Sequence, residues 1–397
     1  MERGISMGRM STDKLAMMDF GKARALMGER GIDLLVINLP KHVYYASNFD
    51  SFDCLIASDA QTFAVIPLRE DQERYLVASH SERFWFNDFP TPFEKVLLPG
   101  FFYVKGGDDF SDQIVANPFE GLTRAIGELG HKSGRIGIEE SHLPVSTSQG
   151  LRKRFPGAEF VDASDIPIKL RMVKNSEEIV RLKKASDTVQ VGIHAALRAS
   201  KPGITERELD RVFREKVNSE GVDTLYVQVS FAGRGAYGPS LPTDKVLKEG
   251  ELVRVDASTS YKGYVSDICR FAVVGRASQE MKDYYEITFK AEQAAIKTVR
   301  EGVRVCDVFN TAVVIPPEAG YKDYRRHHVG HGIGLDAHEA PILSPKNEMP
   351  LEKNMVLCVE TPYYIWGLGG FAPEDMLVVT ETGCEMLTTP QTEILEL

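Results

Sequence analysis

Two aspartates, Asp256 and Asp267, lie on neighbouring strand-like segments that are joined by a turn-like stretch around Lys262 and Gly263. Because side chains alternate along a strand, pairing of these segments would bring both carboxylates to one face of a sheet. Two carboxylates at such close range repel each other unless a cation lies between them. The pair therefore indicates a metal site, although either aspartate alone also fits an ordinary surface or turn residue.

A second group of chemically active residues lies in the segment RRHHVGHGIGLDAHEAP, which is rich in histidine and glycine. Glycine permits close backbone approach, and imidazole can bind a metal or carry a proton. A solvent-exposed loop could have the same composition, but the density of imidazoles favours a functional site. The histidines are His327, His328, His331 and His338.

Two glutamates adjoin apolar runs further along the chain. Glu360 follows the apolar run in MVLCVETP, and Glu374 precedes the apolar run in APEDMLVV. An acidic side chain at the edge of a buried strand needs an ion-pair partner or a metal. The alternative for each glutamate is a strand-end charge that points into solvent.

The first part of the chain must fold separately from the segments that carry these candidates. Short apolar runs in GIDLLVINLP, TFAVIPL, RYLVAS and RIGIEE alternate there with helical or loop-like pieces. Continuous apolar runs of this length are typical of buried strands in an α/β unit. We therefore predict an α/β domain over residues 1–170.

Helices and paired strands follow one another in the rest of the chain, and we predict an α+β domain over residues 171–397. Ser176 is the predicted N-cap of a first helix with an acidic opening turn. Thr205 caps a second predicted helix that stops near Gly221, and SQEMKDYYEITFKAEQAAIKTVREG fits a third. The strand candidates are ELVRVDAS, GYVSDICRFAVVG, NMVLCVETPYY and EDMLVVTETG.

Composition and charge exclude several classes of partner. The 57 acidic and 47 basic residues give a formal net charge of -10 without a dense basic block, which argues against nucleic acid. The start of the chain lacks a secretory pattern and the apolar runs are too short to span a membrane, so we expect a cytoplasmic protein. Five scattered cysteines without a CxxC pair indicate reduced thiols.

The order of the candidate residues, Asp, Asp, His, Glu and Glu, resembles that of the pita-bread metallohydrolases. This superfamily includes creatinases, prolidases, Xaa-Pro aminopeptidases and methionine aminopeptidases. The resemblance rests on VDASTSYKGYVSDICR, GHGIGLDAHEAP, VETPYY and PEDMLVVTETG. The N-terminal α/β region and the linker LRMVKNSEEI are similar to those of the creatinase and prolidase branch. The resemblance therefore implies a creatinase-type N-terminal domain, a pita-bread catalytic domain and a homodimer.

Carried over residue by residue, the resemblance implies a centre of two divalent metal ions. Asp256 would bind one ion, Asp267 and Glu374 would bridge both, and His331 with Glu360 would complete the second. Oxygen ligands with one imidazole suit Mn, Fe, Co or Zn, of which Mn is favoured. Two such ions can activate a shared water and polarise a carbonyl, so the implied reaction is hydrolysis of an amide or related C-N bond.

The resemblance also implies roles for side chains around the ions. Glu360 would accept a proton from the nucleophile and pass it to the leaving nitrogen. His338 would donate a hydrogen bond to the substrate carbonyl or to the developing oxyanion. His327 would line the substrate pocket, and Tyr237 is a further candidate for substrate binding.

Two positions depart from the pattern of the proline-directed members. Pro239 stands where they carry a pocket histidine, and Ala372 stands where they carry an arginine before the last glutamate. His328 stands where glycine is usual. Tyr237, Arg234 and His328 are polar residues that could compensate for the missing side chains.

Three functions are therefore compatible with the resemblance. The leading prediction is an Xaa-Pro dipeptidase or aminopeptidase-like enzyme that acts on a dipeptide or another small molecule. The departures favour an alternative, which is a hydrolase or lyase of a small nitrogenous metabolite, as in creatinases and ectoine hydrolases. A non-catalytic binding module of the same fold is disfavoured because all five ligand positions hold suitable residues.

Overall fold

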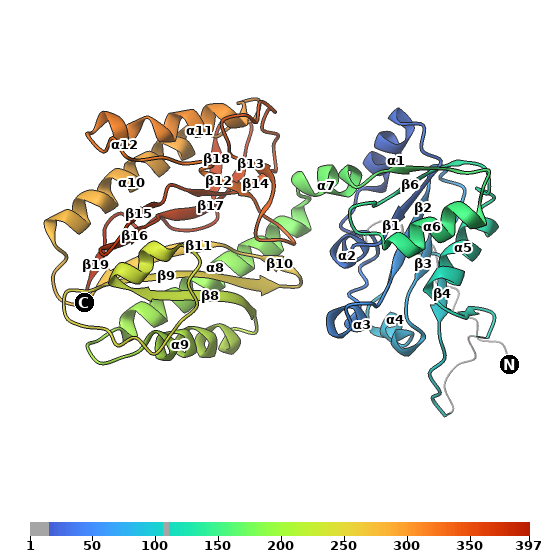
Figure 1. The fold of residues 1–397 in the computed structure, drawn as a ribbon, viewed down its shortest axis with the longest axis horizontal. Coiled ribbons are helices and arrows are strands. Elements are labelled where there is room, and N and C mark those ends of the chain that lie inside the picture. The colour runs from blue at the N-terminus through green and yellow to red at the C-terminus, as the bar shows by residue number, and fades with distance from the viewer. Residues whose placement is uncertain (1–15, 106–110) are drawn as a thin grey trace. The chain divides into compact units, whose positions relative to one another are not determined.

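The computed structural model describes residues 16–105 and 111–397, and the chain divides into two compact units, Met1–Arg171 and Met172–Leu397 (Figure 1). The first unit is an α/β structure and the second is an α+β structure, as the sequence predicts. Among the helices of these described ranges, none has the length and apolar character that crossing a membrane requires.

The first unit is built around a seven-stranded sheet with the order β5-β4-β3-β2-β1-β6-β7. The sheet is mixed, because β1 pairs antiparallel with β2 and parallel with β6. Each of the four apolar runs in this region forms one of its strands. The strands are β1 (Leu34–Ile37), β2 (Phe63–Pro67), β3 (Tyr75–Val77), β4 (Lys95–Pro99), β5 (Ile114–Val115), β6 (Arg135–Ile138) and β7 (Glu159–Asp162).

Helices bury the central strands of this sheet, which explains why β1 is apolar at every position. Leu34 and Val36 of β1 belong to one hydrophobic cluster with Leu122 and Ile126 of α5. The helices are α1 (Phe20–Glu29), α2 (Pro40–Ser47), α3 (Phe52–Ile56), α4 (Trp85–Asp88), α5 (Pro118–Glu128), α6 (Val145–Arg154) and α7 (Asp165–Met172), with a short 3-10 helix η2 (His80–Glu82).

The second unit contains a ten-stranded sheet with the central order β10-β9-β11-β17-β14-β12-β13. β8 pairs with β9, β18 with β17 and β19 with β11, while β15 and β16 form a separate ribbon. The strands are β8 (Asp223–Phe231), β9 (Leu252–Tyr261), β10 (Tyr264–Val265), β11 (Ile268–Val273), β12 (Gly330–Gly332), β13 (Glu339–Ile342), β14 (Val356–Glu360), β15 (Tyr363–Ile365), β16 (Gly369–Phe371), β17 (Glu374–Val379), β18 (Cys384–Met386) and β19 (Leu395–Glu396).

The three longest helices of this unit begin at residues whose side chains cap them, and one cap differs from the prediction. Thr205 caps α9 as predicted, but the N-cap of α8 is Asn175 and not Ser176. Asn175 and Glu178 form a reciprocal capping box, which Ser176 could not form with that glutamate. The helices are α8 (Ser176–Ala199), α9 (Glu206–Ser219), α10 (Gln279–Thr298), α11 (Val305–Val313) and α12 (Ile315–Glu318), with a 3-10 helix η3 (Ala232–Tyr237).

One face of the central strands is turned towards helices and the other carries the candidate site. Leu357 and Val359 of β14 belong to a hydrophobic cluster that includes side chains of α10 and α11. Because side chains alternate along a strand, Cys358 and Glu360 point to the opposite face. The apolar core below the sheet thus positions polar residues above it.

Candidate metal centre

A tight hairpin turn brings Asp256 and Asp267 together. Lys262 and Gly263 join β9 to β10 with φ angles of 50° and 81°, the positive values that a two-residue hairpin turn requires. After the turn, β11 pairs with β9 so that Cys269 lies opposite Asp256. Asp267 precedes Cys269 by two residues and therefore points to the same face as Asp256.

The sheet register adds two further carboxylates to this face. Cys269 of β11 also pairs with Glu374 of β17, and Glu374 pairs with Glu360 of β14. Directly opposed residues on neighbouring strands share a face, so the row from Asp256 to Glu360 lies on one side of the sheet. Carboxylates from chain segments far apart in the sequence thus converge.

β12 places His331 on the same face, opposite Cys358, and two glycines make this placement possible. A Cβ atom at Gly330 would lie 2.1 Å from the carbonyl oxygen of Cys358, and one at Gly332 would lie 2.2 Å from that of Ala340. Only glycine allows the backbone to approach that closely. The glycines around His331 therefore let β12 fit between β13 and β14.

Donor atoms at this face form three overlapping groups, and within each group the atoms lie within 4.8 Å of one another. The groups are Asp256 with Asp267 and Glu374, Asp267 with His331 and His338, and His331 with Cys358 and Glu374. Asp256, Asp267, His331 and Glu374 are buried, with at most 8% exposure. Glu360 belongs to none of these three groups of described residues.

Burial and mutual repulsion raise the pKa values of the grouped carboxyls. Burial raises the pKa of Asp267 well above its usual value, and the nearby Asp256 raises it further. Burial is also the main cause of the raised pKa of Glu374, to which Asp267 and Asp256 add. The pKa of Asp256 is raised by burial as well. Such a group is stable in its charged form only when cations are near.

The imidazoles beside these carboxyls are held in the neutral form. Burial lowers the pKa of His331 to about 3 and that of His328 to about 4. The Nδ1 atom of His331 lies 3.1 Å from the carbonyl oxygen of Gly332. Its Nε2 atom is buried without a hydrogen-bond partner within the described part of the chain. A neutral imidazole with a free nitrogen is suited to bind a metal ion.

Glu360 lies at the rim of the acidic group. Its side chain is 14% exposed, and its Oε1 atom lies 3.4 Å from Nδ1 of His328. Burial is the main cause of the raised pKa values of Asp267 and Glu374, and the negative charge of Glu360 raises both further. The Glu360 carboxylate is therefore close to the two buried carboxylates. Glu360 can therefore interact with buried groups and with solvent at once.

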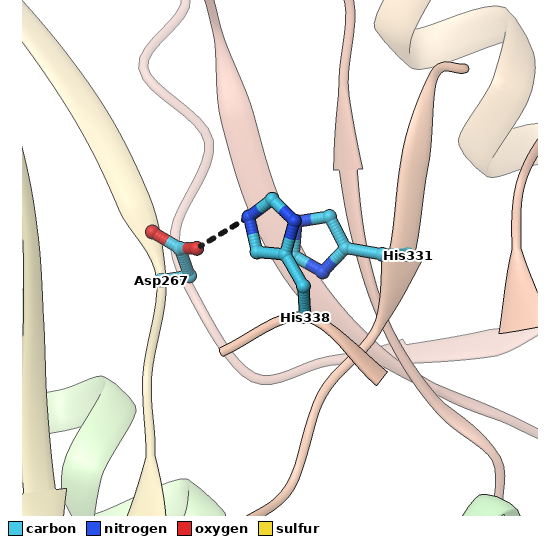
Figure 2. A group of neighbouring side chains, drawn as sticks. All are labelled: Asp267, His331 and His338. Atoms are coloured by element: carbon cyan, nitrogen blue, oxygen red, sulfur yellow. Dashed lines mark ion pairs between the residues drawn. The ribbon is translucent and has the colours of Figure 1, made fainter. Parts of the chain in front are cut away.

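His338 lies over His331 on the open side of the site (Figure 2). The two ring centroids are 3.8 Å apart, and the ring planes differ by 17°. The Nε2 atom of His338 lies 4.0 Å from Oδ2 of Asp267, and the side chain is 62% exposed. An exposed imidazole beside buried carboxylates is placed to meet a bound molecule.

The other predicted substrate contacts lie further out. His327 is exposed and packs its ring against that of the following histidine, with the centroids 4.4 Å apart. Tyr237 is 51% exposed and stacks on Trp366. Arg234, a predicted compensating cation, instead donates to Glu206 and lies over the ring of Tyr237. None of the described contacts joins Arg234 to the acidic group.

Two side chains that donate hydrogen bonds to the aspartates of this group are absent from the sequence-based prediction. Tyr226 of β8 donates its hydroxyl hydrogen to Oδ1 of Asp267, and Arg254 of β9 donates to Oδ2 of Asp256. Arg254 precedes Asp256 by two residues in LVRVDAS, so strand periodicity could have placed it on this face. Tyr226 gives no such signal, because it lies next to a register shift between β8 and β9.

Comparison with known families agrees with this architecture. Residues 180–381 match metallopeptidase family M24, and residues 20–173 match the creatinase/prolidase N-terminal domain. The chain therefore belongs to metallopeptidase family M24, in the branch with a creatinase-type N-terminal domain. The prediction of a pita-bread metallohydrolase of the creatinase and prolidase branch is confirmed.

The chain is similar to individual peptidases along most of its length. An uncharacterized peptidase of Staphylococcus epidermidis is 32% identical over 274 residues, which are 68% of this chain and 76% of that protein. An Xaa-Pro dipeptidase of Lactobacillus delbrueckii subsp. lactis is 27% identical over 95% of this chain and 98% of its own. The structure of an Xaa-Pro dipeptidase from Bacillus anthracis is 25% identical, with a TM-score of 0.83 over 98% of this chain and 100% of that one. The chain is thus a metal-dependent hydrolytic enzyme.

Proposed function

We propose that this enzyme is a dinuclear metallopeptidase that cleaves the amide bond of Xaa-Pro dipeptides. The observation that carries the proposal is the convergence of Asp256, Asp267, His331 and Glu374 on one face of the second sheet, with donor atoms close enough to share ions. These residues come from four strands or strand ends, β9, β11, β12 and β17. A shared metal site is the simplest reason for so dense a group of buried donors.

The donor set fits a pair of divalent cations. The four carboxylates carry four negative charges, which two divalent ions neutralise and one ion does not. The unpartnered Nε2 atom of His331 would be satisfied by an ion at the same face. Mostly oxygen donors with one imidazole suit Mn, Fe, Co or Zn, and we favour Mn.

Each ligand has a proposed place in this centre. We assign Asp256 to one ion, Asp267 and Glu374 to both ions, and His331 with Glu360 to the second. The ions would supply an activated water and polarisation of the scissile carbonyl. Because Glu360 lies outside the buried groups of donor atoms, its carboxylate is the ligand that must move most.

Two side chains at the rim are proposed to handle protons and charge during hydrolysis. Glu360 would accept a proton and deliver it to the leaving nitrogen, since it is partly exposed and adjoins the buried carboxylates. His338 would donate a hydrogen bond to the carbonyl oxygen of the substrate as negative charge develops there. Its 62% exposure leaves room for such a contact.

Substrate contacts further from the ions are assigned to His327 and Tyr237. His327 is exposed beside His328, and it would line the pocket near the reacting bond. Tyr237 stacks on Trp366 and would contact the outer part of the substrate. Removal of these side chains should change KM more than kcat.

The choice of Xaa-Pro dipeptides is supported by similarity to the Lactobacillus and Bacillus anthracis Xaa-Pro dipeptidases. Pro239 and Ala372 favour a second candidate, a hydrolase or lyase of a small nitrogenous metabolite. At these positions the proline-directed branch carries a histidine and an arginine. Both candidates use the same metal centre, and they differ only in the groups that bind the substrate.

The experiment that separates them is a turnover assay with the purified enzyme, chelated and then reloaded with Mn²⁺. Xaa-Pro dipeptides would be compared with matched dipeptides that end in alanine, and with a panel of cyclic and guanidino compounds. We expect metal-dependent release of proline. Turnover of a panel compound without any Xaa-Pro hydrolysis would assign the enzyme to the second candidate.

The family resemblance also leads us to propose a homodimer with a cytoplasmic location. Light scattering coupled to size-exclusion chromatography should give twice the mass of one chain. A mass equal to one chain at micromolar concentration would contradict the dimer.

A further inference from the structure

The proposed metal ligands lie on two sets of strands that meet between β11 and β17, and we call this contact the seam. Asp256 and Asp267 lie on the side of β9 and β11, and the other ligands lie on the side of β17, β14 and β12. β11 pairs with β9, and β14 with β17, along their whole lengths. Across the seam, the described residues form a single pair, Cys269 with Glu374. The spacing of the ligands therefore depends on how this seam is held.

Side-chain contacts replace the backbone ladder on either side of that pair. The backbone N–H of Asp267 donates to the Sδ atom of Met376 at 3.3 Å. Further along β11, the side chain of Gln391 binds both the N–H and the carbonyl oxygen of Phe271, at 2.9 and 2.7 Å. Backbone hydrogen bonds hold neighbouring strands roughly 4.7 to 4.9 Å apart, so a seam with so few of them needs another connection.

Arg270 supplies a connection across the seam. It follows Cys269 on β11, so its side chain points to the opposite face from the metal ligands. Its Nη1 atom donates to the carbonyl oxygen of Cys269 at 3.0 Å and to that of Glu374 at 2.7 Å. The side chain is 4% exposed, so water does not compete for these bonds. One buried guanidinium thus ties both strands together at the residue pair that joins them.

Asp375 and Thr389 hold this guanidinium in place. The Nη2 atom of Arg270 donates to Oδ1 of Asp375 at 2.5 Å and to the carbonyl oxygen of Thr389 at 2.7 Å. Asp375 is 1% exposed, and the hydroxyl of Thr388 also donates to its Oδ1 atom, at 2.6 Å. The donors of a guanidinium have fixed directions in one plane, so acceptors on several sides leave it one orientation. The backbone of Glu374 is therefore held by a rigid group.

We propose that Arg270 is a positioning residue for the metal centre, because it sets the separation of β11 and β17 and with it the spacing of Asp267 and Glu374. Both carboxylates are assigned to bridge the two ions, so their spacing decides whether two ions can be held together. The inference rests on the proposed dinuclear centre and adds the group that holds its two sides together. The contact that carries this role is with the main chain of Glu374.

The test titrates Mn²⁺ into the chelated wild type and into chelated Arg270→Met. Calorimetry measures the affinity, and electron paramagnetic resonance shows whether the bound ions are close enough to couple. Loss of a group that orients a metal ligand weakens metal binding by roughly 10- to 100-fold, and we expect a loss in this range. We also expect the spectrum of a coupled pair to give way to that of separate ions, because altered spacing affects the bridging ligands first.

A variant with balanced charge separates positioning from the cost of a buried charge. Arg270→Met leaves Asp375 buried without its cation, which by itself destabilises a fold. Arg270→Met/Asp375→Asn removes both charges and should regain most of the melting temperature that Arg270→Met loses. It still lacks the bond to the carbonyl oxygen of Glu374, so its Mn²⁺ affinity should stay as low as that of Arg270→Met.

Arg234→Met is a matched control in the same unit. Arg234 also binds a buried carboxylate, that of Glu206, and a backbone carbonyl oxygen, that of Leu241. Its loss should lower the melting temperature without a change in Mn²⁺ affinity, because these bonds do not cross the seam.

Two outcomes would overturn the inference. Folded Arg270→Met or folded double variant that binds two coupled Mn²⁺ ions as tightly as the wild type would show that Arg270 does not position the ligands. An equal loss of affinity in Arg234→Met would show that any destabilisation of this unit weakens the site. If Arg270→Met does not fold, the double variant takes its place in the comparison. A wild type that binds fewer than two Mn²⁺ ions would instead contradict the proposed dinuclear centre, so the two failures are distinguishable.

Discussion

Asp256 and Glu374 flank Cys269 from opposite sides, because β9 and β17 pair with opposite edges of β11. Their carboxylate oxygens, with one from Asp267, lie within 4.8 Å of one another. The three residues reach this arrangement through strand register, and their distance along the chain is irrelevant to it. The following predictions test whether the arrangement holds metal ions and performs hydrolysis.

The first prediction concerns a proposed bridging ligand. Asp267→Asn keeps the shape of the side chain but removes its charge, so it should reduce bound Mn²⁺ below two ions per chain. Loss of an outer-shell partner of a metal ligand lowers activity by up to about 100-fold. Asp267 is a proposed ligand itself, so peptidase activity should fall by more than about 100-fold. Metal content by mass spectrometry checks this, with Glu385→Gln on the exposed part of β18 as the control. Full metal content in Asp267→Asn would contradict the assignment.

The second prediction separates the roles proposed for two exposed histidines, His338 and His327. His338→Ala should lower kcat by about 10² to 10³-fold, because it removes a donor to the developing oxyanion. His327→Ala should instead raise KM with a smaller effect on kcat. Steady-state kinetics on one Xaa-Pro dipeptide measures both. Equal effects of the two substitutions on kcat would argue against the role of His338.

The third prediction concerns Tyr226, whose hydroxyl donates to Asp267. Tyr226→Phe should weaken Mn²⁺ binding by roughly 10-fold, because the hydrogen bond orients a proposed bridging carboxylate. Tyr261→Phe, at the end of β9, is a control of the same chemical type. Calorimetric titration measures the difference, and indistinguishable affinities for all three proteins would remove Tyr226 from the centre.

The fourth prediction concerns the pH dependence of stability without metal. Burial raises the folded-state pKa of Asp267 above its ordinary value of 3.8, so the folded state binds more protons than the unfolded state. The contribution of Asp267 to stability is therefore lost as pH rises above 3.8. Chelated wild type should therefore lose stability relative to chelated Asp267→Asn as the pH rises above 3.8. Denaturant unfolding at several pH values measures this, and parallel curves would contradict it.

The fifth prediction distinguishes the two candidate caps of α8. Asn175→Ala should lower the free energy of unfolding by about 1 kcal/mol, because it removes one half of the capping box. Ser176→Ala should have little effect, since the serine is already inside the helix. Urea denaturation of both variants compares them directly. A larger loss for Ser176→Ala would reverse the assignment.

Local patterns predicted the elements of this fold well. The apolar runs became strands because a strand buried on both faces needs apolar residues at every position. Residue type and context predict the Thr205 cap, which the structure has. The same signals do not separate Asn175 from Ser176, because asparagine and serine are equally good caps and only the glutamate three residues after Asn175 distinguishes them.

The acidic ligands could be listed from their order in the chain, but their partners could not. Closeness in sequence to Pro239 predicts Arg234 as a substitute cation, but the structure pairs Arg234 with Glu206. Arg254 contacts Asp256, and the only local signal for this contact is its place two residues before Asp256 on β9. The order of residues along the chain shows which residue types are present. The register of the strands determines which of their side chains lie next to one another.

The most direct test of the account is anomalous diffraction from crystals of the Mn²⁺-loaded enzyme. We predict two peaks per chain, roughly 3.5 to 4 Å apart as in other two-metal sites, each within bonding distance of Asp267 and Glu374. A single peak, or peaks remote from these carboxylates, would contradict a dinuclear centre at this face of the sheet.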